Sequence, residues 1–208
     1  MFYTVKVPWI FKKIRPSLVW KMPVEGKKIY LTFDDGPHPT ATPFVLDQLK
    51  RFNAKATFFC IGKNVVENNA IYARILNEGH QVGNHTFNHL NGWKTNNTQY
   101  INNVLEAAKY IDSNLFRPPY GRISAFQSKL LMQADNAHPF KIIMWSVLSG
   151  DFDTKLAPEN CLKNIILHTK PGDIIVFHDS AKAWERLSFA LPRFLKYFTD
   201  HQYEFCLL

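Results

Sequence analysis

Two adjacent carboxylates, Asp34 and Asp35, end an apolar stretch in the segment IYLTFDDGPHP, residues 29–39. Two like charges repel each other, and burial at the end of a strand disfavours both ionised forms. A divalent cation resolves this conflict, because it binds one carboxylate as a ligand while the other stays free to act as a base. The pair therefore indicates metal-assisted hydrolysis, and the remaining ligands must come from elsewhere in the chain.

A histidine pair offers those ligands. His85 and His89 are four residues apart, a spacing that places two imidazoles on one face of a helical turn. Together with an aspartate from a neighbouring strand end they form a set of two nitrogens and one oxygen, which leaves an open position for water, as in catalytic zinc sites. The sequence thus predicts a divalent metal. Zinc is favoured, and cobalt, nickel or iron fit the same ligands.

An alternation of strands and helices must position these residues. Short runs rich in β-branched and aromatic residues predict strands at 28–33, 55–60, 80–84, 115–116, 141–147, 173–178 and 203–208. Segments with helical spacing lie between them, at 40–52, 64–78, 98–112, 124–134, 158–168 and 183–199. The first helix is expected to start with Thr42 as its cap and Pro43 as its first residue. This pattern predicts a single α/β domain of parallel βαβ units, as a barrel or an open sheet.

Reactive side chains gather after the predicted strands. In parallel α/β barrels the chemistry lies at the carboxyl ends of the strands. Besides the residues above, the groups that follow or end a strand are Arg117, Tyr120, Asp151, Asp153, His178 and Asp179. Because chance would distribute such residues over both rims, their position predicts one shared site at one rim.

Positive charge is concentrated at the beginning of the chain. Residues 1–28 contribute +6 to the formal net charge of +8, so the other 180 residues are close to neutral. A nucleic-acid enzyme would carry its basic residues over its main body, so we expect no nucleic-acid partner. The leader, residues 1–27, is expected to pack on the domain. Contact of Trp9, Ile10 and Phe11 with an anionic membrane surface is the less favoured alternative, since two prolines interrupt any long helix there.

The cysteines and the apolar runs indicate where in the cell the protein is located. Three cysteines, Cys60, Cys161 and Cys206, lie far apart in apolar contexts and predict buried thiols, not a disulfide framework or a metal site. No secretory signal and no run of membrane-spanning length is legible. We therefore expect a cytoplasmic protein.

Five segments also occur in the order of a known set of motifs: TFDDGPHP, HTFNH, RPPYG, WSVLSGDF and IIVFHD. In this order and spacing they resemble the motifs of the polysaccharide deacetylase family, carbohydrate esterase family 4 with its NodB homology domain. The resemblance extends over residues 28–208. It implies a distorted (β/α)7-type barrel and a metal-dependent hydrolase that removes acetyl groups from N-acetylated sugars, in a poly- or oligosaccharide that contains N-acetylglucosamine.

The resemblance also implies a role for each matching residue. The implied metal ligands are Asp35, His85 and His89, and the implied catalytic residues are Asp34 as base, Arg117 as its partner, Tyr120 as backbone donor to the oxyanion, His178 as acid and Asp151 as its partner. Thr86 is expected to support the metal loop through its hydroxyl. Candidates for stacking on a sugar ring are Tyr120, Trp93, Phe152 and Trp184, with core packing as the alternative for the last three.

Two positions depart from the family pattern. The family usually has Asp-Trp where this chain has Asp151-Phe152, and often an earlier Asp where Leu148 stands. These differences leave Asp153 as an alternative partner for His178. Two other functions also stay open: an O-acetyl carbohydrate esterase of the acetylxylan type, and a carbohydrate-binding relative without turnover. The second requires a damaged set of catalytic residues, and here no ligand or base is missing.

Overall fold

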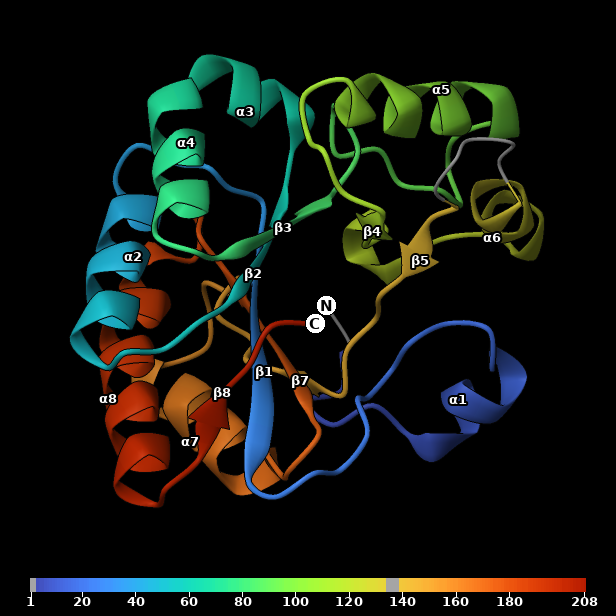
Figure 1. Ribbon diagram of the computed structural model, residues 1–208. Helices are drawn as coiled ribbons and strands as arrows, with labels where there is room; N and C mark the ends of the chain where they lie inside the picture. The colour runs from blue at the N-terminus through green and yellow to red at the C-terminus, as the bar shows by residue number, and fades with distance from the viewer. Residues whose placement is uncertain (1–2, 134–138) are drawn as a thin grey trace.

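A curled sheet of parallel strands forms the centre of the molecule, in a computed structural model that describes residues 3–133 and 139–208 (Figure 1). The strands follow the order β5-β4-β3-β2-β1-β7-β6, and β8 pairs with the start of β1. Every pair between these strands is parallel. The expected parallel α/β fold with a distorted barrel is therefore confirmed.

The elements have the following bounds. The strands are β1 (Lys28–Asp34), β2 (Thr57–Cys60), β3 (Gln81–Asn84), β4 (Leu115–Phe116), β5 (Lys141–Ile142), β6 (Val147–Leu148), β7 (Ile174–His178) and β8 (Glu204–Phe205). The helices are α1 (Trp9–Ile14), α2 (Ala41–Arg51), α3 (Gly62–Glu67), α4 (Asn69–Asn77), α5 (Asn97–Ala108), α6 (Ala125–Met132), α7 (Pro158–His168) and α8 (Trp184–Asp200), and Pro119–Gly121 forms a 3-10 turn.

Two predicted elements are each divided into two in the structure. The helix expected at 64–78 is two helices, α3 and α4, separated at Asn68, whose side chain donates to the carbonyl of Pro37. The strand expected at 141–147 is broken into β5 and β6. The segment between them turns toward β7, where the Ser146 N–H donates to Ile174 O. The last residue of the helix predicted at 124–134 lies outside the described residues.

The cap predicted for the helix at 40–52, which is α2 in the structure, is wrong. The helix begins at Ala41, so Thr42 lies inside its first turn and Pro43 is its third residue. The Thr42 hydroxyl accepts from the His38 N–H at 2.7 Å and donates to Asp179 at 2.5 Å. A buried carboxylate from another part of the chain thus takes the hydroxyl that the sequence pattern assigns to capping.

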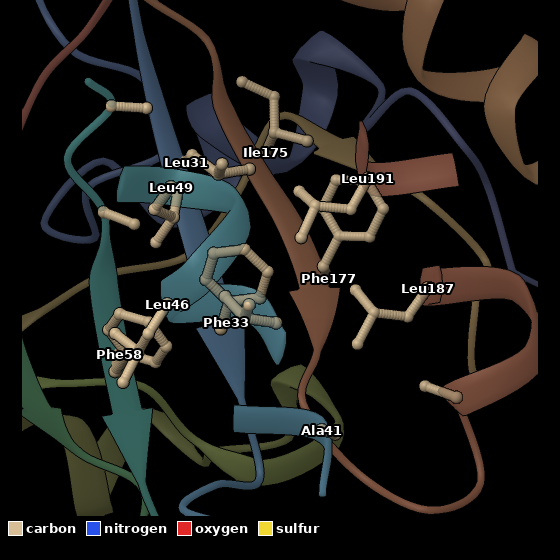
Figure 2. Close-up of a cluster of buried hydrophobic side chains, with 14 of the residues drawn as sticks. Leu31, Phe33, Ala41, Leu46, Leu49, Phe58, Ile175, Phe177, Leu187 and Leu191 are labelled. Carbon is tan, nitrogen blue, oxygen red and sulfur yellow. The ribbon is translucent and has the colours of Figure 1, made fainter. Parts of the chain in front are cut away.

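The core lies between the sheet and the helices α2, α7 and α8. All residues of β1 after Lys28 are buried, which explains why its sequence is a continuous apolar run. Phe33 stacks on Phe58 and Phe177 from the two neighbouring strands, with ring centroids 5.1 and 6.0 Å apart. Figure 2 shows these rings packed with leucines of α2 and α8. This packing fixes the strand ends from which the site is built.

The leader lies at the open seam of the barrel. Among the described residues no ladder joins β5 to β6, the two end strands of the sheet. Leader residues pair with the chain on both sides of this seam, because Val19 bridges to Ile143 and Lys6 bridges to Val147. Lys6 also forms an ion pair with the buried Asp173 at 2.5 Å. The leader therefore occupies the place where a closed barrel would have its last strand pairing.

Helix α1 stands apart from this packing (Figure 1). None of its residues is buried. Its exposed apolar side chains are Trp9, Ile10, Phe11 and Ile14. No described helix has the length and apolarity that a bilayer crossing requires.

Candidate active site

Three predicted metal ligands converge at the carboxyl ends of β1 and β3. One ligand atom each from Asp35, His85 and His89 lies within 4.8 Å of the other two. Asp35 Oδ1 is 3.7 Å from His85 Nε2 and 3.2 Å from His89 Nε2. This oxygen is buried and accepts no well-formed hydrogen bond from any described residue. Two imidazole nitrogens around an unsatisfied carboxylate oxygen are a donor set that fits one divalent ion.

The backbone of this site is unusual. Three of its residues have left-handed conformations, Asp35 with φ 83°, Thr86 with φ 65° and His89 with φ 57°. Residues other than glycine rarely adopt this region, and such strain concentrates at functional sites. The helical turn that we expected for His85 and His89 is wrong, because residues 85–90 form a loop. The loop curls so that both imidazoles reach Asp35.

Hydrogen bonds from the chain hold these left-handed residues. The Thr86 N–H donates to the Asn84 side chain at 2.8 Å, and the Thr86 hydroxyl accepts from the Leu90 N–H at 3.2 Å. The Asn64 side chain donates to the Asp35 carbonyl at 2.7 Å. These bonds supply the energy that keeps left-handed residues in place.

His85 is held as a neutral ligand. Its Nδ1 lies 2.7 Å from the carbonyl of Arg117, an acceptor that requires a proton on Nδ1. The lone pair of Nε2 then faces Asp35. Burial lowers the pKa of His85 to about 4, and the charges of Asp34 and Asp35 offset only part of this effect. The imidazole is therefore neutral at neutral pH, as a metal ligand must be.

Asp34, the other carboxylate of the pair, has a different partner. The buried Arg117 guanidinium donates to Asp34 Oδ1 at 2.7 Å and to the Thr32 hydroxyl at 2.8 Å. Arg117 also donates to the carbonyls of Ile143 and Met144. A base fixed in this way keeps one defined orientation toward the pocket.

His178 lies across the pocket with an anionic partner. Its Nδ1 is 2.7 Å from Asp151 Oδ1, and its backbone N–H donates to Asp151 Oδ2, also at 2.7 Å. Burial alone lowers the pKa of His178, but the Asp151 charge and hydrogen bond outweigh it and raise the pKa to about 9. Asp153, the alternative partner, instead accepts from the Tyr3 hydroxyl at 3.3 Å.

These groups line one pocket of about 340 Å³. Among its lining residues are Asp34, Asp35, His85, His89, Tyr120 and His178. Tyr120 has a left-handed backbone with φ 60°, and its ring contacts His89 at 4.7 Å between centroids. No described carbonyl or side-chain oxygen accepts the Tyr120 N–H. The pocket thus combines a candidate metal-ligand set, a carboxylate paired with a guanidinium, and an imidazole paired with a carboxylate.

Comparisons with known proteins identify the family. The sequence profile of the family described as polysaccharide deacetylase matches residues 21–140. The chain belongs to the polysaccharide deacetylase family. A peptidoglycan-N-acetylglucosamine deacetylase of Bacillus cereus is 33% identical over 202 residues, which cover 93% of this chain and 93% of that protein. A chitooligosaccharide deacetylase of Azorhizobium caulinodans is 35% identical over 158 residues, which cover 73% of this chain and 73% of that protein.

Solved structures of the polysaccharide deacetylase family share the fold. The crystal structure of a peptidoglycan N-acetylglucosamine deacetylase in complex with 4-naphthalen-1-yl-N-oxidanyl-benzamide has a TM-score of 0.86 and 30% identity, and the match covers 97% of this chain and 95% of that one. Peptidoglycan deacetylase PdaC from Bacillus subtilis has a TM-score of 0.76 and 26% identity over 88% of each chain.

The four aromatic residues expected to bind sugar lie in different places in this deacetylase. Tyr120 and Phe152 line the pocket. Trp93 is mostly exposed, and its ring packs 5.2 Å from the guanidinium of Arg122, a residue of the pocket wall. Trp184 packs edge-on against Phe44 of α2 at 5.2 Å and is not among the residues that line the pocket.

Asp179 is a supporting residue that the sequence placed at the end of a strand but to which we assigned no role. It is buried directly after His178, and its carboxylate accepts from the Gly36 N–H at 3.0 Å and from Thr42. A Cβ on Gly36 would lie 2.0 Å from Asp179 Oδ2, so only glycine fits beside it. Burial raises the pKa of Asp179 to about 8. Its place at the end of the segment IIVFHD was the available signal.

Proposed function

We propose that this chain is a metal-dependent deacetylase that releases acetate from N-acetylglucosamine units of a poly- or oligosaccharide. The observation that carries the proposal is the presence in one pocket of the Asp35, His85 and His89 set, the Asp34–Arg117 pair and the Asp151–His178 pair. Relatives with names such as peptidoglycan-N-acetylglucosamine deacetylase and chitooligosaccharide deacetylase support the choice of substrate. Residues 28–208 form the deacetylase domain in this proposal, with the leader packed on it.

Asp35, His85 and His89 would hold the metal, and zinc suits this ligand set best. When bound, such an ion supplies Lewis acidity, which lowers the pKa of water and polarises the acetyl carbonyl. Titration of metal-free protein with zinc, cobalt, nickel and iron(II) tests the choice of metal. The expected result is retention of one equivalent of zinc after dialysis against the other ions.

The chain's own residues carry the proton transfers. Asp34, oriented by Arg117, accepts a proton from the water whose oxygen forms the new bond to the acetyl carbon. The Tyr120 N–H donates to the carbonyl oxygen as negative charge develops there. His178 then gives its Nε2 proton to the amide nitrogen, the C–N bond breaks, and acetic acid and a free amine leave. The acid loses its remaining water proton to solvent as acetate, and the proton held by Asp34 returns to His178 through solvent. An amine is a poor leaving group without this proton, and Asp151 keeps His178 protonated near neutral pH.

Acetate release from an acetylated chitooligosaccharide tests the proposal. The wild-type protein should release acetate, lose activity with a chelator and regain it with added zinc. The matched control is Asp34→Asn, which should bind metal and release almost no acetate. Absence of acetate release by the zinc-loaded wild-type protein on both chitooligosaccharide and peptidoglycan fragments would overturn the assignment.

The Asp151–His178 pair favours an amide over an ester substrate. An alcohol leaves more easily than an amine, so an O-acetyl esterase depends less on a proton from His178. His178→Ala should therefore reduce amide hydrolysis about 10²- to 10⁴-fold. Hydrolysis of an acetylated xylan by the same variant should fall less. A higher wild-type kcat/KM on the xylan would make the esterase the better description.

A further inference from the structure

The N-terminal segment reaches the rim of the active-site pocket. Residues 5–7 run antiparallel to β6, with Val7 N–H donating to Ser146 O at 3.0 Å and Leu148 N–H donating to Val5 O at 2.8 Å. The strand β6 runs toward the catalytic rim, and the leader runs antiparallel to it. The residues that precede Val5 therefore lie at the same rim. Tyr3 lines the pocket together with the catalytic groups.

Tyr3 is held in place by three contacts. Its ring packs edge-on against Phe152, with centroids 5.1 Å apart. Its hydroxyl donates to Asp153. Gly150, with φ 82°, lies so close that an added Cβ would be 2.8 Å from the Tyr3 hydroxyl. The segment between the end of β6 and α7 therefore forms a close-fitting binding site for the Tyr3 side chain.

Tyr3 and Phe152 extend the wall that starts at His178. The Phe152 ring lies edge-on to His178 at 5.2 Å, and the Lys182 ammonium is 6.0 Å from the Phe152 ring. Two aromatic rings beside an ammonium group offer an apolar surface with a hydrogen-bond donor at its edge, which suits the C–H face and hydroxyls of a sugar. The acid side of the pocket is also the side on which the sugar amine leaves.

We propose that Tyr3 and Phe152 form a subsite for a neighbouring sugar of the chain on the His178 side of the pocket. This inference rests on the proposed deacetylase function. Tyr3 lies in the leader, outside the five segments that resemble the family's motifs. The leader thus supplies a specificity element that the catalytic motifs do not contain.

Steady-state kinetics with N-acetylglucosamine oligomers of different length test the subsite. Tyr3→Ala should raise KM for the tetramer roughly five- to tenfold and leave kcat unchanged, because a stacking surface binds substrate and transition state alike. For the shortest oligomer that the wild-type protein turns over, the same substitution should change KM less than about twofold. Tyr3→Phe, which keeps the ring, should behave as the wild type on both.

Two further variants separate sugar binding from anchoring of the leader. Tyr3→Leu keeps apolar volume for packing and lacks the flat ring, so it should raise KM for the tetramer as Tyr3→Ala does, with a Tm close to that of the wild type. Tyr110→Ala, at an exposed tyrosine next to Phe87 and away from the pocket, is the matched control. Titration calorimetry of the tetramer in an Asp34→Asn background should give the same fold-change in Kd for each Tyr3 variant.

The outcomes separate the two proposals. A wild-type protein that releases no acetate contradicts the deacetylase function, whatever Tyr3 does. An active wild type whose Tyr3→Ala and Tyr3→Leu variants have unchanged KM for the tetramer, or equal increases for both oligomer lengths, overturns the subsite.

Discussion

Two histidines on opposite sides of one pocket, the buried His85 and the partly buried His178, have opposite protonation states. On the metal side His85 bonds to the neutral carbonyl of Arg117, and burial lowers its pKa to about 4. On the acid side His178 bonds to the carboxylate of Asp151. Despite burial, this partner raises the pKa of His178 to about 9. The imidazole is the same in both places, so the partner of Nδ1 decides whether the fold makes a ligand or an acid.

The paired aspartates show the same division. The Asp34 carboxylate accepts from a guanidinium, whereas Asp35 Oδ1 lies 3.7 and 3.2 Å from two imidazole nitrogens, although the two aspartates are adjacent in the chain. Asp34 is the last residue of β1, and Asp35 follows it with a left-handed backbone, φ 83°. The two carboxylates therefore have different partners.

The largest expected effect comes from removing a ligand on the metal side. Asp35→Ala should abolish stable metal binding and with it nearly all turnover. Asp34→Asn should retain the metal and lose kcat about 10²- to 10⁴-fold, as expected for loss of a general base. Metal analysis after gel filtration and acetate-release assays measure both. The reverse pattern would show that the two carboxylates have exchanged roles.

On the acid side, Asp151→Asn should lower kcat about 10²-fold, because a neutral amide no longer stabilises the protonated His178. The metal content should stay at the wild-type level, since no metal-ligand candidate contacts Asp151. The same variant should move the alkaline limb of the pH–rate profile to lower pH. An unchanged limb would mean that His178 is not the group that titrates there.

The wild-type pH profile gives an effect of intermediate size. His178 is the acid in its protonated form, which is present below its pKa of about 9 and lost above it. Therefore kcat/KM should fall about tenfold per pH unit above that value. His85 is already neutral above about pH 4 and should not limit activity between neutral pH and pH 9. An alkaline limb of the pH–rate profile centred near the ordinary histidine pKa would show that Asp151 does not raise the pKa of His178.

The smallest effects are expected for the aromatic side chains. Phe152→Ala removes part of the wall beside His178 and should raise KM for a tetramer roughly five- to tenfold. Trp184→Ala affects a ring that packs on Phe44, and should change KM less than about twofold. A larger effect of Trp184→Ala would extend the substrate groove over α2 and α8.

The sequence was sufficient for features that depend on local pattern. Strand and helix alternation predicted the parallel sheet, and the position of His178 and the two aspartates after strands predicted a shared rim. The prediction of a helical turn at His85 and His89 was wrong because a loop with left-handed residues brings the two imidazoles together at the same spacing. That conformation depends on distant partners such as Asn103, whose side chain accepts from the N–H groups of Phe87 and Asn88. The choice between Asp151 and Asp153 likewise required the tertiary structure.

The break between β5 and β6 has a similar cause. The apolar run at 141–147 looks like one strand, but Ser146 turns to donate to the buried Asp173 at 2.9 Å and to the backbone of β7. The leader then fills the seam through Val19 and Lys6. The leader contacts join residues more than a hundred positions apart, and those of Ser146 join residues 27 and 28 positions apart, so no local pattern of the chain contains them.

Arg117 connects two functions through a single residue. Its guanidinium fixes the orientation of Asp34, while its carbonyl fixes the tautomer of His85. Any displacement of β4 would move both at once, so the two cannot be adjusted independently by evolution or by design. A library that aims to alter proton abstraction without affecting ion affinity should keep this arginine and its strand constant, and vary the neighbours of Asp151 instead.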